Sequence, residues 1–471
     1  MKKKGIIIST IVLLVAILTT ILIIGTSKSN DYYYDDRLIS NKYEYEQTIT
    51  DESIESDYYY SDSYFKDSSY LENEHLRTFA LSIALSFNPT NRKEEVNYNL
   101  NKIYNELEFN DVEYYDLNDF SKDTIGTSIA HKKLNDKYEL VIIVLRGASY
   151  QSEWESNLDL GNKGNAKGFD DSSVIVLNRL KDYINNNKIK DYKLLVTGYS
   201  RAAAISGLVG VHINEESKEY NIEKEDLYVY SFESPKYSNI DKKYKNIHNV
   251  INKNDIVTYV YPESWGLYHS GIDEDVTTNS KNIKERYLDI FSSEKIKELE
   301  EIDLQRFIKK FINSLPKDRT GYDDIYNSII DIYRLINNKT SFEKNKIINH
   351  FKNSKIDLNL DYSIKLLSLL NSNDKESLKK SYNSFISIFD KDYYKIKDVL
   401  SEKEYNSLKD DIFNILFYLK PMINDEYKSN YKFSNILTFA FNLEDIFKEH
   451  YFNTILKQVQ NKDSYYNENA Y

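Results

Sequence analysis

The central part of the chain alternates between short apolar runs and longer amphipathic stretches. Apolar runs at 140–145 and 192–197 have the length and composition of buried strands, and a strand-like run at 126–134 precedes the first of them across an Asn-Asp-Lys turn. Apolar residues at helical spacing follow at 169–187 and at 201–213. Strands that alternate with helices in this way predict an α/β fold with a mostly parallel sheet.

Two further regions have a helical period. The stretch 71–87 repeats apolar residues at helical spacing, and a series of amphipathic stretches with few strand signals begins at about residue 278. The second region predicts a helical cap or an appended helical domain.

The first 27 residues have the pattern of a membrane-spanning segment. Three lysines at positions 2–4 precede an uncharged apolar run. Its length of roughly 20 residues would cross a bilayer as a helix. The lysines favour a cytoplasmic N-terminus, which would place the rest of the chain outside the cytoplasm. No convincing cleavage site follows, so we expect an uncleaved signal-anchor in the cell membrane; cleavage would instead give a secreted protein.

Residues 28–70 are rich in Tyr, Asp, Ser and Glu and have no steady period. This composition predicts an acidic, poorly ordered stalk between the membrane and the folded part.

Composition excludes several kinds of site. The formal net charge of −12 disfavours binding to nucleic acid, which is a polyanion. The chain has no cysteine, which excludes disulfides, thiolate nucleophiles and cysteine-ligated metals. No His-x-x-x-His pair and no glycine-rich phosphate loop is present. We therefore expect no metal and no cofactor, and the sequence contains no indication of the oligomeric state.

A serine lies between a predicted strand and a predicted helix, in the segment VTGYSRAAAISG. Ser200 has Gly198 two positions before it and Ala202 two positions after it. One class of hydrolase holds its nucleophilic serine on such a tight strand-to-helix turn, where crowding requires small residues at these two positions. The pattern Gly-x-Ser-x-Ala also arises by chance, so the motif alone is a hypothesis that its position between strand and helix strengthens.

Three segments around this motif strengthen the hypothesis further. They are VIIVLRGASYQSEWESNLDLG, KGFDDSSVIVLNRL and VINKNDIVTYVYPESWGLYHSGID, and they occur in this order between residues 140 and 273. Together with the serine motif they resemble the class 3 (fungal-type) lipases, which have the α/β-hydrolase fold.

The resemblance implies roles for individual residues. Ser200 would be the nucleophile, and Asp255 would be the acid that orients the base. The backbone N–H groups of Ala148 and Arg201 would form the oxyanion hole. Ala148 stands where the family usually has Ser or Thr, and Tyr199 stands where it usually has His; we expect no chemical role for Tyr199. Without the resemblance, Asp255 reads equally well as a turn residue or a helix cap.

The base is expected after the acid in chain order, as in other hydrolases of this fold. The candidates are His269, His350 and His450. His269 follows Asp255 closely, whereas His350 lies in a helical run where a packing or surface role is simplest. The related lipases place the base near the C-terminus, and His450 precedes a final amphipathic stretch in a similar way. The resemblance therefore implies His450, with His269 as the alternative base.

These assignments imply a domain organisation. Residues 71–277 would form the α/β-hydrolase core, 278–440 a helical insertion, and 441–471 a return to the core that carries His450. The implied function is an extracytoplasmic, membrane-anchored serine hydrolase of lipase or esterase type, which cleaves carboxylic esters of lipids or other compounds through an acyl-enzyme.

Two alternatives stay open. One is a catalytically inactive, hydrolase-like surface protein that binds a partner through its helical region. The other is a peptidase or thioesterase, because the fold and the triad do not fix the acyl group.

Overall fold

The computed structural model describes residues 37–43, 54–87, 96–117, 125–147, 156–157, 159–277, 319, 327–328, 331–332, 334–335, 339–353, 375–423, 450 and 452–463. The N-terminal segment expected to span a membrane, residues 1–27, lies outside these residues. Within the described part, no helix is both long enough and apolar enough to cross a bilayer.

Seven strands form one sheet in the order β3-β4-β5-β6-β7-β8-β9. Their bounds are β3 (Asn110–Tyr115), β4 (Thr127–Lys133), β5 (Glu139–Leu145), β6 (Tyr192–Tyr199), β7 (Leu227–Phe232), β8 (Ile247–Ile251) and β9 (Ile272–Asp275). The pairs from β3 to β5 are antiparallel, and the pairs from β5 to β9 are parallel. The prediction of an α/β fold with a mostly parallel sheet is confirmed, although the polar edge strands β3 and β9 were not expected from the sequence.

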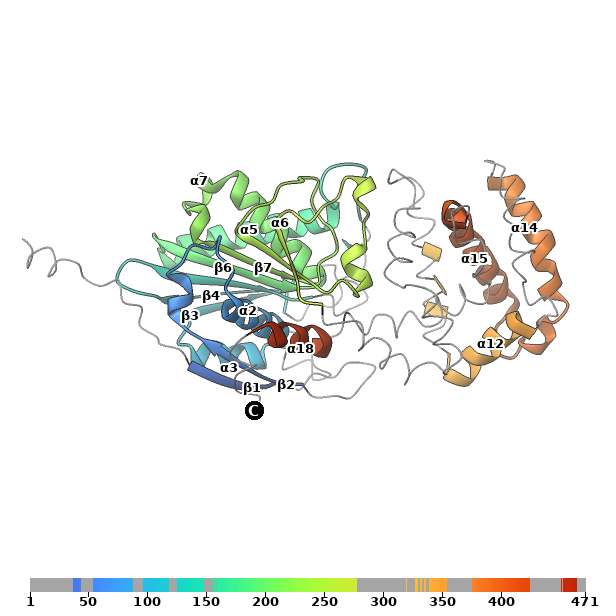
Figure 1. Cartoon of the computed structure of the whole chain (residues 1–471), viewed down its shortest axis with the longest axis horizontal. Helices are drawn as coiled ribbons and strands as arrows, with labels where there is room; N and C mark the ends of the chain where they lie inside the picture. The colour runs from blue at the N-terminus through green and yellow to red at the C-terminus, as the bar shows by residue number, and fades with distance from the viewer. Residues whose placement is uncertain are drawn as a thin grey trace, which may run out of the picture.

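Helices cover both faces of this sheet, as Figure 1 shows. One face carries α2 (Glu74–Ser86), α3 (Tyr98–Glu106) and α18 (Phe452–Lys462), and the other carries α5 (Lys167–Asn187) and α6 (Arg201–Glu215). The shorter helices of this part are α7 (Ser217–Tyr220), η1 (Asp62–Phe65), η4 (Lys224–Asp226), η5 (Ile256–Tyr259) and η6 (Glu263–Trp265).

Strand β5 explains why helices are needed on both faces. Successive side chains of a strand point to opposite faces of the sheet. Leu140, Ile142 and Val144 belong to the apolar cluster formed with α2 and α18, whereas their neighbours Val141 and Ile143 belong to the cluster formed with α5 and α6. An apolar run without polar alternation therefore becomes a central strand buried on both sides.

Residues 37–43 and 54–70, within the segment 28–70 that was expected to be a poorly ordered stalk, contain regular secondary structure. Strand β1 (Arg37–Tyr43) pairs antiparallel with β2 (Ile54–Tyr60), and η1 follows. Tyr60 and Phe65 are fully buried. Tyr60 packs on Phe79 of α2 with 4.8 Å between ring centroids, and Phe65 packs on Tyr228 of β7 at 5.2 Å. The polar composition conceals these contacts because two aromatic rings bury a large apolar area without producing a sequence period.

The segment 278–440 contains three long helices among its described residues. These are α12 (Ser341–Asn353), α14 (Lys375–Asp390) and α15 (Glu402–Ile423), with the short η7 (Tyr393–Lys395), and they lie to one side of the sheet in Figure 1. Tyr382 of α14 packs on Phe413 of α15 with 5.0 Å between ring centroids. Arg319 donates to the carbonyl oxygens of Leu160 (2.6 Å) and Gly164 (2.7 Å), which attaches this segment to the loop before α5.

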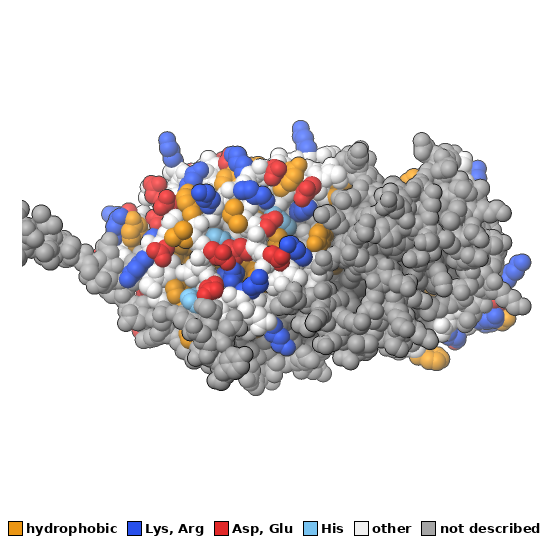
Figure 2. All heavy atoms as spheres, viewed as in Figure 1, with side chains coloured by type: hydrophobic (Ala, Val, Ile, Leu, Met, Phe, Trp, Pro, Cys, Tyr) orange, Lys and Arg blue, Asp and Glu red, His pale blue; other side chains and the backbone are white. Residues whose placement is uncertain are grey.

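Acidic and basic side chains are interspersed over the face of the sheet domain that Figure 2 shows. Exposed ion pairs of this domain include Lys167 with Asp171 (2.8 Å) and Lys242 with Glu215 (2.7 Å). Among the described residues of this face, the acidic side chains are therefore not gathered into a single patch.

Candidate active site

Ser200 lies in the turn between β6 and α6. Its backbone has φ 59° and ψ −123°, a strained conformation for a residue other than glycine. Its N–H donates to the carbonyl oxygen of Phe232 (2.9 Å), which ties the turn to the end of β7. A Cβ on Gly198 would lie 2.5 Å from the carbonyl oxygen of Ala202 and 2.8 Å from its Cβ. This crowding is the physical reason for the small residues on either side of the serine.

Asp255 follows β8 and caps η5. Its side chain is fully buried, and its Oδ1 accepts a hydrogen bond from the N–H of Val257 (2.9 Å). The N–H of Asp255 donates to the carbonyl oxygen of Asn252 (3.0 Å). The capping role that the sequence allowed is therefore present, but it occupies only one of the two carboxylate oxygens.

His450 joins the serine to the aspartate. Its Nδ1–H donates to Oδ2 of Asp255 (2.5 Å), and its Nε2 accepts from Oγ of Ser200 (2.8 Å). The carboxylate at Nδ1 assigns this tautomer, because an ionised carboxylate can only accept. The His450 side chain is 14% exposed, so one edge of the site is open to solvent.

The other two candidate histidines are held elsewhere. His269 is buried, its Nε2–H donates to the carbonyl oxygen of Ser234 (2.9 Å), and burial lowers its pKa. His350 lies on α12, where its Nε2 is 3.4 Å from the hydroxyl of Tyr405, and burial lowers its pKa as well. Of the three, His450 is the one that the structure places against Ser200.

One aromatic residue packs on the His450 ring, and a second supports the first. Tyr199 stacks on it with 5.0 Å between centroids and 28° between planes. Phe452 packs edge-on against Tyr199 at 4.6 Å. The sequence motif predicted no chemical role for Tyr199 and did not indicate this packing role, although the position directly before the serine places its ring near the base.

The expected oxyanion hole is described only in part. Arg201 is the first residue of α6, and the N–H groups of a helix's first turn have no acceptor within the helix. The Arg201 side chain is buried, and its guanidinium donates to Oγ of Ser156 (2.8 Å). Ala148 lies outside the described residues.

A second buried carboxylate, Glu233, lies beside the triad and was not found from the sequence. It directly follows β7, it is fully buried, and its Oε1 accepts from the N–H of Asn252 (3.0 Å). One donor atom each from Glu233, Asp255 and His450 lie within 4.8 Å of one another. The segment SFESP carries no recognised motif, so only the three-dimensional structure brings Glu233 to the site.

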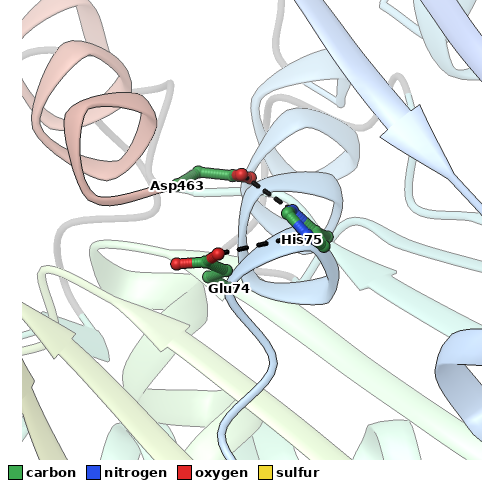
Figure 3. A group of neighbouring side chains, drawn as sticks. All are labelled: Glu74, His75 and Asp463. Carbon is green, nitrogen blue, oxygen red and sulfur yellow. Dashed lines mark hydrogen bonds and ion pairs between the residues drawn. The ribbon is translucent and has the colours of Figure 1, made fainter. Parts of the chain in front are cut away.

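A second group with similar spacing lies at the junction of α2 and α18, where Figure 3 shows Glu74, His75 and Asp463. Nδ1 of His75 donates to one oxygen of Asp463 (2.7 Å), and the hydroxyl of Thr78 donates to the other (2.7 Å). Because Asp463 follows α18, these two hydrogen bonds form a clasp between the end of α18 and the first turns of α2.

A mostly parallel sheet with helices on both faces and a serine on a strand-to-helix turn is an arrangement consistent with the α/β-hydrolase fold. Residues 142–265 match the family described as lipase (class 3). This match confirms the likeness to class 3 lipases that the sequence motifs predicted, and it supports a carboxylic ester hydrolase activity.

Several solved structures are similar to this chain. The lipase from Rhizopus microsporus var. chinensis has 18% identity and a TM-score of 0.32, over 43% of this chain and 74% of that one. The triacylglyceride lipase of Rhizomucor miehei has 19% identity and a TM-score of 0.31, over 44% and 80%. Lipase II from Rhizopus niveus has 17% identity and a TM-score of 0.32, over 52% and 86%. Among curated proteins, no relative matches.

Proposed function

We propose that this protein is a membrane-anchored, extracytoplasmic lipase or esterase whose triad is Ser200, His450 and Asp255. The observation that carries the proposal is the position of His450, which bridges Ser200 Oγ at 2.8 Å and Asp255 Oδ2 at 2.5 Å. A serine hydroxyl becomes an effective nucleophile only when an oriented base takes its proton, and this chain of hydrogen bonds supplies that base.

The reaction proceeds in two halves. Ser200 Oγ attacks the ester carbonyl carbon while its proton passes to His450 Nε2, and the resulting tetrahedral intermediate carries a negative oxygen. The carbon–oxygen bond to the alcohol then breaks, and His450 gives the proton to the departing alcohol. Water attacks the acyl-enzyme in the same way, with His450 as base, and releases the carboxylic acid and free Ser200.

The oxyanion would be stabilised by backbone N–H groups at the start of α6 and in the loop after β5. Arg201 and Ala148 are the residues whose N–H groups we assign to this role. A hole of this kind needs only backbone donors, so the alanine at position 148 does not remove it. The helix N-terminus adds a favourable dipole for the negative oxygen.

Lipid esters are the substrate class that the family match favours, and residues 1–27 support a location beside them. Lys2, Lys3 and Lys4 before an apolar run favour a cytoplasmic N-terminus and an extracytoplasmic catalytic domain. Such an anchor would hold the site next to a bilayer, where long-chain esters are concentrated.

The test of the triad uses the full chain in detergent micelles. Hydrolysis of p-nitrophenyl butyrate and palmitate is measured for the wild type and for Ser200→Ala, His450→Ala and Asp255→Asn, with His269→Gln as the matched control. Removing the nucleophile or the base should lower kcat by about 10⁶-fold, and His269→Gln should retain kcat. An alkyl phosphonate should label Ser200 in the wild type, as read by mass spectrometry.

The outcomes separate the alternatives. Absence of both turnover and phosphonate labelling would refute the proposal and favour a hydrolase-like binding protein. Labelling with turnover of thioesters or peptides but not of oxygen esters would reassign the substrate. Anchoring is tested separately: the full chain should stay in the membrane fraction after alkaline carbonate washing, and its catalytic domain should be digested by protease added outside intact cells.

A further inference from the structure

Glu233 is a costly residue at its position. Its carboxylate is fully buried, and removing a carboxylate from water costs free energy. Its backbone has φ 53°, in the left-handed region that a residue other than glycine adopts at a cost. A strained backbone and a buried carboxyl group together, at the end of a central strand, are characteristic of functional sites.

The backbone of Glu233 lies between the parts of the chain that carry the nucleophile and the acid. The preceding residue, Phe232, accepts the N–H of Ser200 (2.9 Å), and the N–H of Glu233 donates to Val250 of β8 (3.0 Å). A shift at this point would therefore move the serine turn relative to the strand before Asp255.

The side chain of Glu233 holds the turn that presents Asp255. Its Oε1 accepts the N–H of Asn252, and the carbonyl oxygen of Asn252 accepts the N–H of Asp255, both at 3.0 Å. The side-chain oxygen of Asn252 also accepts the N–H of Asn254 (3.0 Å). One carboxylate oxygen thus supports the whole turn from 252 to 255.

The charge of Glu233 also faces the base. A carboxylate oxygen of Glu233 lies within 4.8 Å of a carboxylate oxygen of Asp255 and of a ring nitrogen of His450. Two ionised carboxylates this close repel each other in a buried site. The repulsion is relieved when a positive charge forms beside them, as it does when His450 takes the serine proton. An interaction that becomes favourable at that stage lowers the barrier rather than strengthening substrate binding.

We infer that Glu233 is a second carboxylate of the active site, a positioning residue that holds the Asp255 turn and stabilises the protonated His450. This inference rests on the proposed triad. It predicts that Glu233 contributes to kcat and not to KM, and that it partly replaces Asp255 when that carboxylate is neutralised.

The test compares Glu233→Gln, Asp255→Asn and the double variant in the full chain in micelles, with p-nitrophenyl butyrate as substrate. Glutamine keeps an oxygen that can accept from Asn252, so the turn is retained while the charge is removed. We expect Glu233→Gln to lower kcat by about tenfold with KM unchanged, well below the roughly 10⁴-fold cost of neutralising the primary aspartate. In the Asp255→Asn background the same change should cost more than tenfold, because Glu233 is then the remaining carboxylate beside His450.

Glu274→Gln is the matched control. Glu274 lies on the edge strand β9, its side chain is 9% exposed, and it accepts hydrogen bonds from His248 (2.5 Å) and Arg77 (3.0 Å). Its replacement should lower thermal stability and leave kcat unchanged. Unchanged kcat in Glu233→Gln, together with a double variant equal to Asp255→Asn, would overturn the inference while leaving the triad intact. A wild type without turnover or phosphonate labelling would instead refute the proposed function itself.

Discussion

Replacing Gly198 by alanine should damage both the fold and the reaction. The new Cβ would lie 2.5 Å from the carbonyl oxygen, 2.6 Å from the carbonyl carbon and 2.8 Å from the Cβ of Ala202. Gly198 cannot easily move away, because it is paired with Leu145 of β5 on one side and with Ser231 of β7 on the other. The start of α6 must therefore shift, and it carries Ser200 with it.

The size of the effect follows from this crowding. Overpacking a rigid site costs about 1–3 kcal/mol of unfolding free energy. A displacement of the nucleophile by about 1 Å lowers the rate by about 10²-fold. We therefore expect Gly198→Ala to lose about 2 kcal/mol in urea unfolding and about 10²-fold in kcat/KM for p-nitrophenyl butyrate. Adding Ala202→Gly should not rescue it, because the two closest contacts are to the backbone of residue 202.

Gly207→Ala is the control for this prediction. Its Cβ would meet Cζ of the Tyr237 ring at 2.3 Å, so it overpacks the same helix further from the serine. The gain in helix propensity of about 1 kcal/mol offsets part of its cost, and catalysis should change little. A Gly198→Ala enzyme with wild-type stability and wild-type kcat/KM would show that the small residues around Ser200 have another cause.

Three further predictions concern stability. A chain that begins at residue 71 lacks the buried rings of Tyr60 and Phe65, each of which contributes about 3–5 kcal/mol to the unfolding free energy. This chain should be insoluble, whereas a chain that begins at residue 31 should fold. Soluble, active protein from the shorter chain would contradict the packing of these two rings. Burial lowers the pKa of His269 from its ordinary 6.5, so the unfolded state binds more protons than the folded state below that pH. The unfolding free energy should therefore fall as the pH drops below about 6.5. His269→Gln should reduce the dependence of the unfolding free energy on pH, measured by urea titrations between pH 7 and pH 5, and should leave the contribution of His350. An unchanged pH dependence would exclude His269 as its source. Asp463→Asn should lower the unfolding free energy by about 1–3 kcal/mol and lower kcat, because one acceptor of the clasp becomes a donor. Glu74 lies 4.0 Å from the His75 ring, so Glu74→Gln should be nearly neutral. Equal effects of the two substitutions would contradict the clasp.

The parts of the fold that the sequence predicts are those with a strong local signal. β5 and β6 are apolar on both faces, and α5 and α6 repeat apolar residues every three or four positions, so their type and order could be read directly. The β4–β5 hairpin is formed as the short polar turn between its strands indicated. The serine turn adds a steric requirement to these patterns, which is why it could be placed between a strand and a helix.

The parts that the sequence does not predict depend on distant partners. β3 and β9 are polar edge strands whose residues lack alternation, and only the neighbouring strands give them a place in the sheet. Glu233 is one acidic residue among the 74 in the chain, and its importance comes from the meeting of β7, β8 and the return that carries His450. Neither kind of feature has a local pattern that could have indicated it.

The base shows how a distant residue is brought to the serine. His450 lies 195 residues after Asp255, so closeness in the sequence does not bring the two side chains together. The helix that follows His450, α18, positions the base instead. Phe452 packs on Tyr199, and Ile455 and Val459 join the apolar cluster with α2. Asp463, at the end of this helix, closes the clasp with His75. The position of the base is therefore set by the docking of α18 on α2, two helices near opposite ends of the chain. It follows that substitutions along this contact, far from the reacting atoms, should lower kcat in proportion to how much they loosen α18, even where Ser200 and Asp255 remain in place.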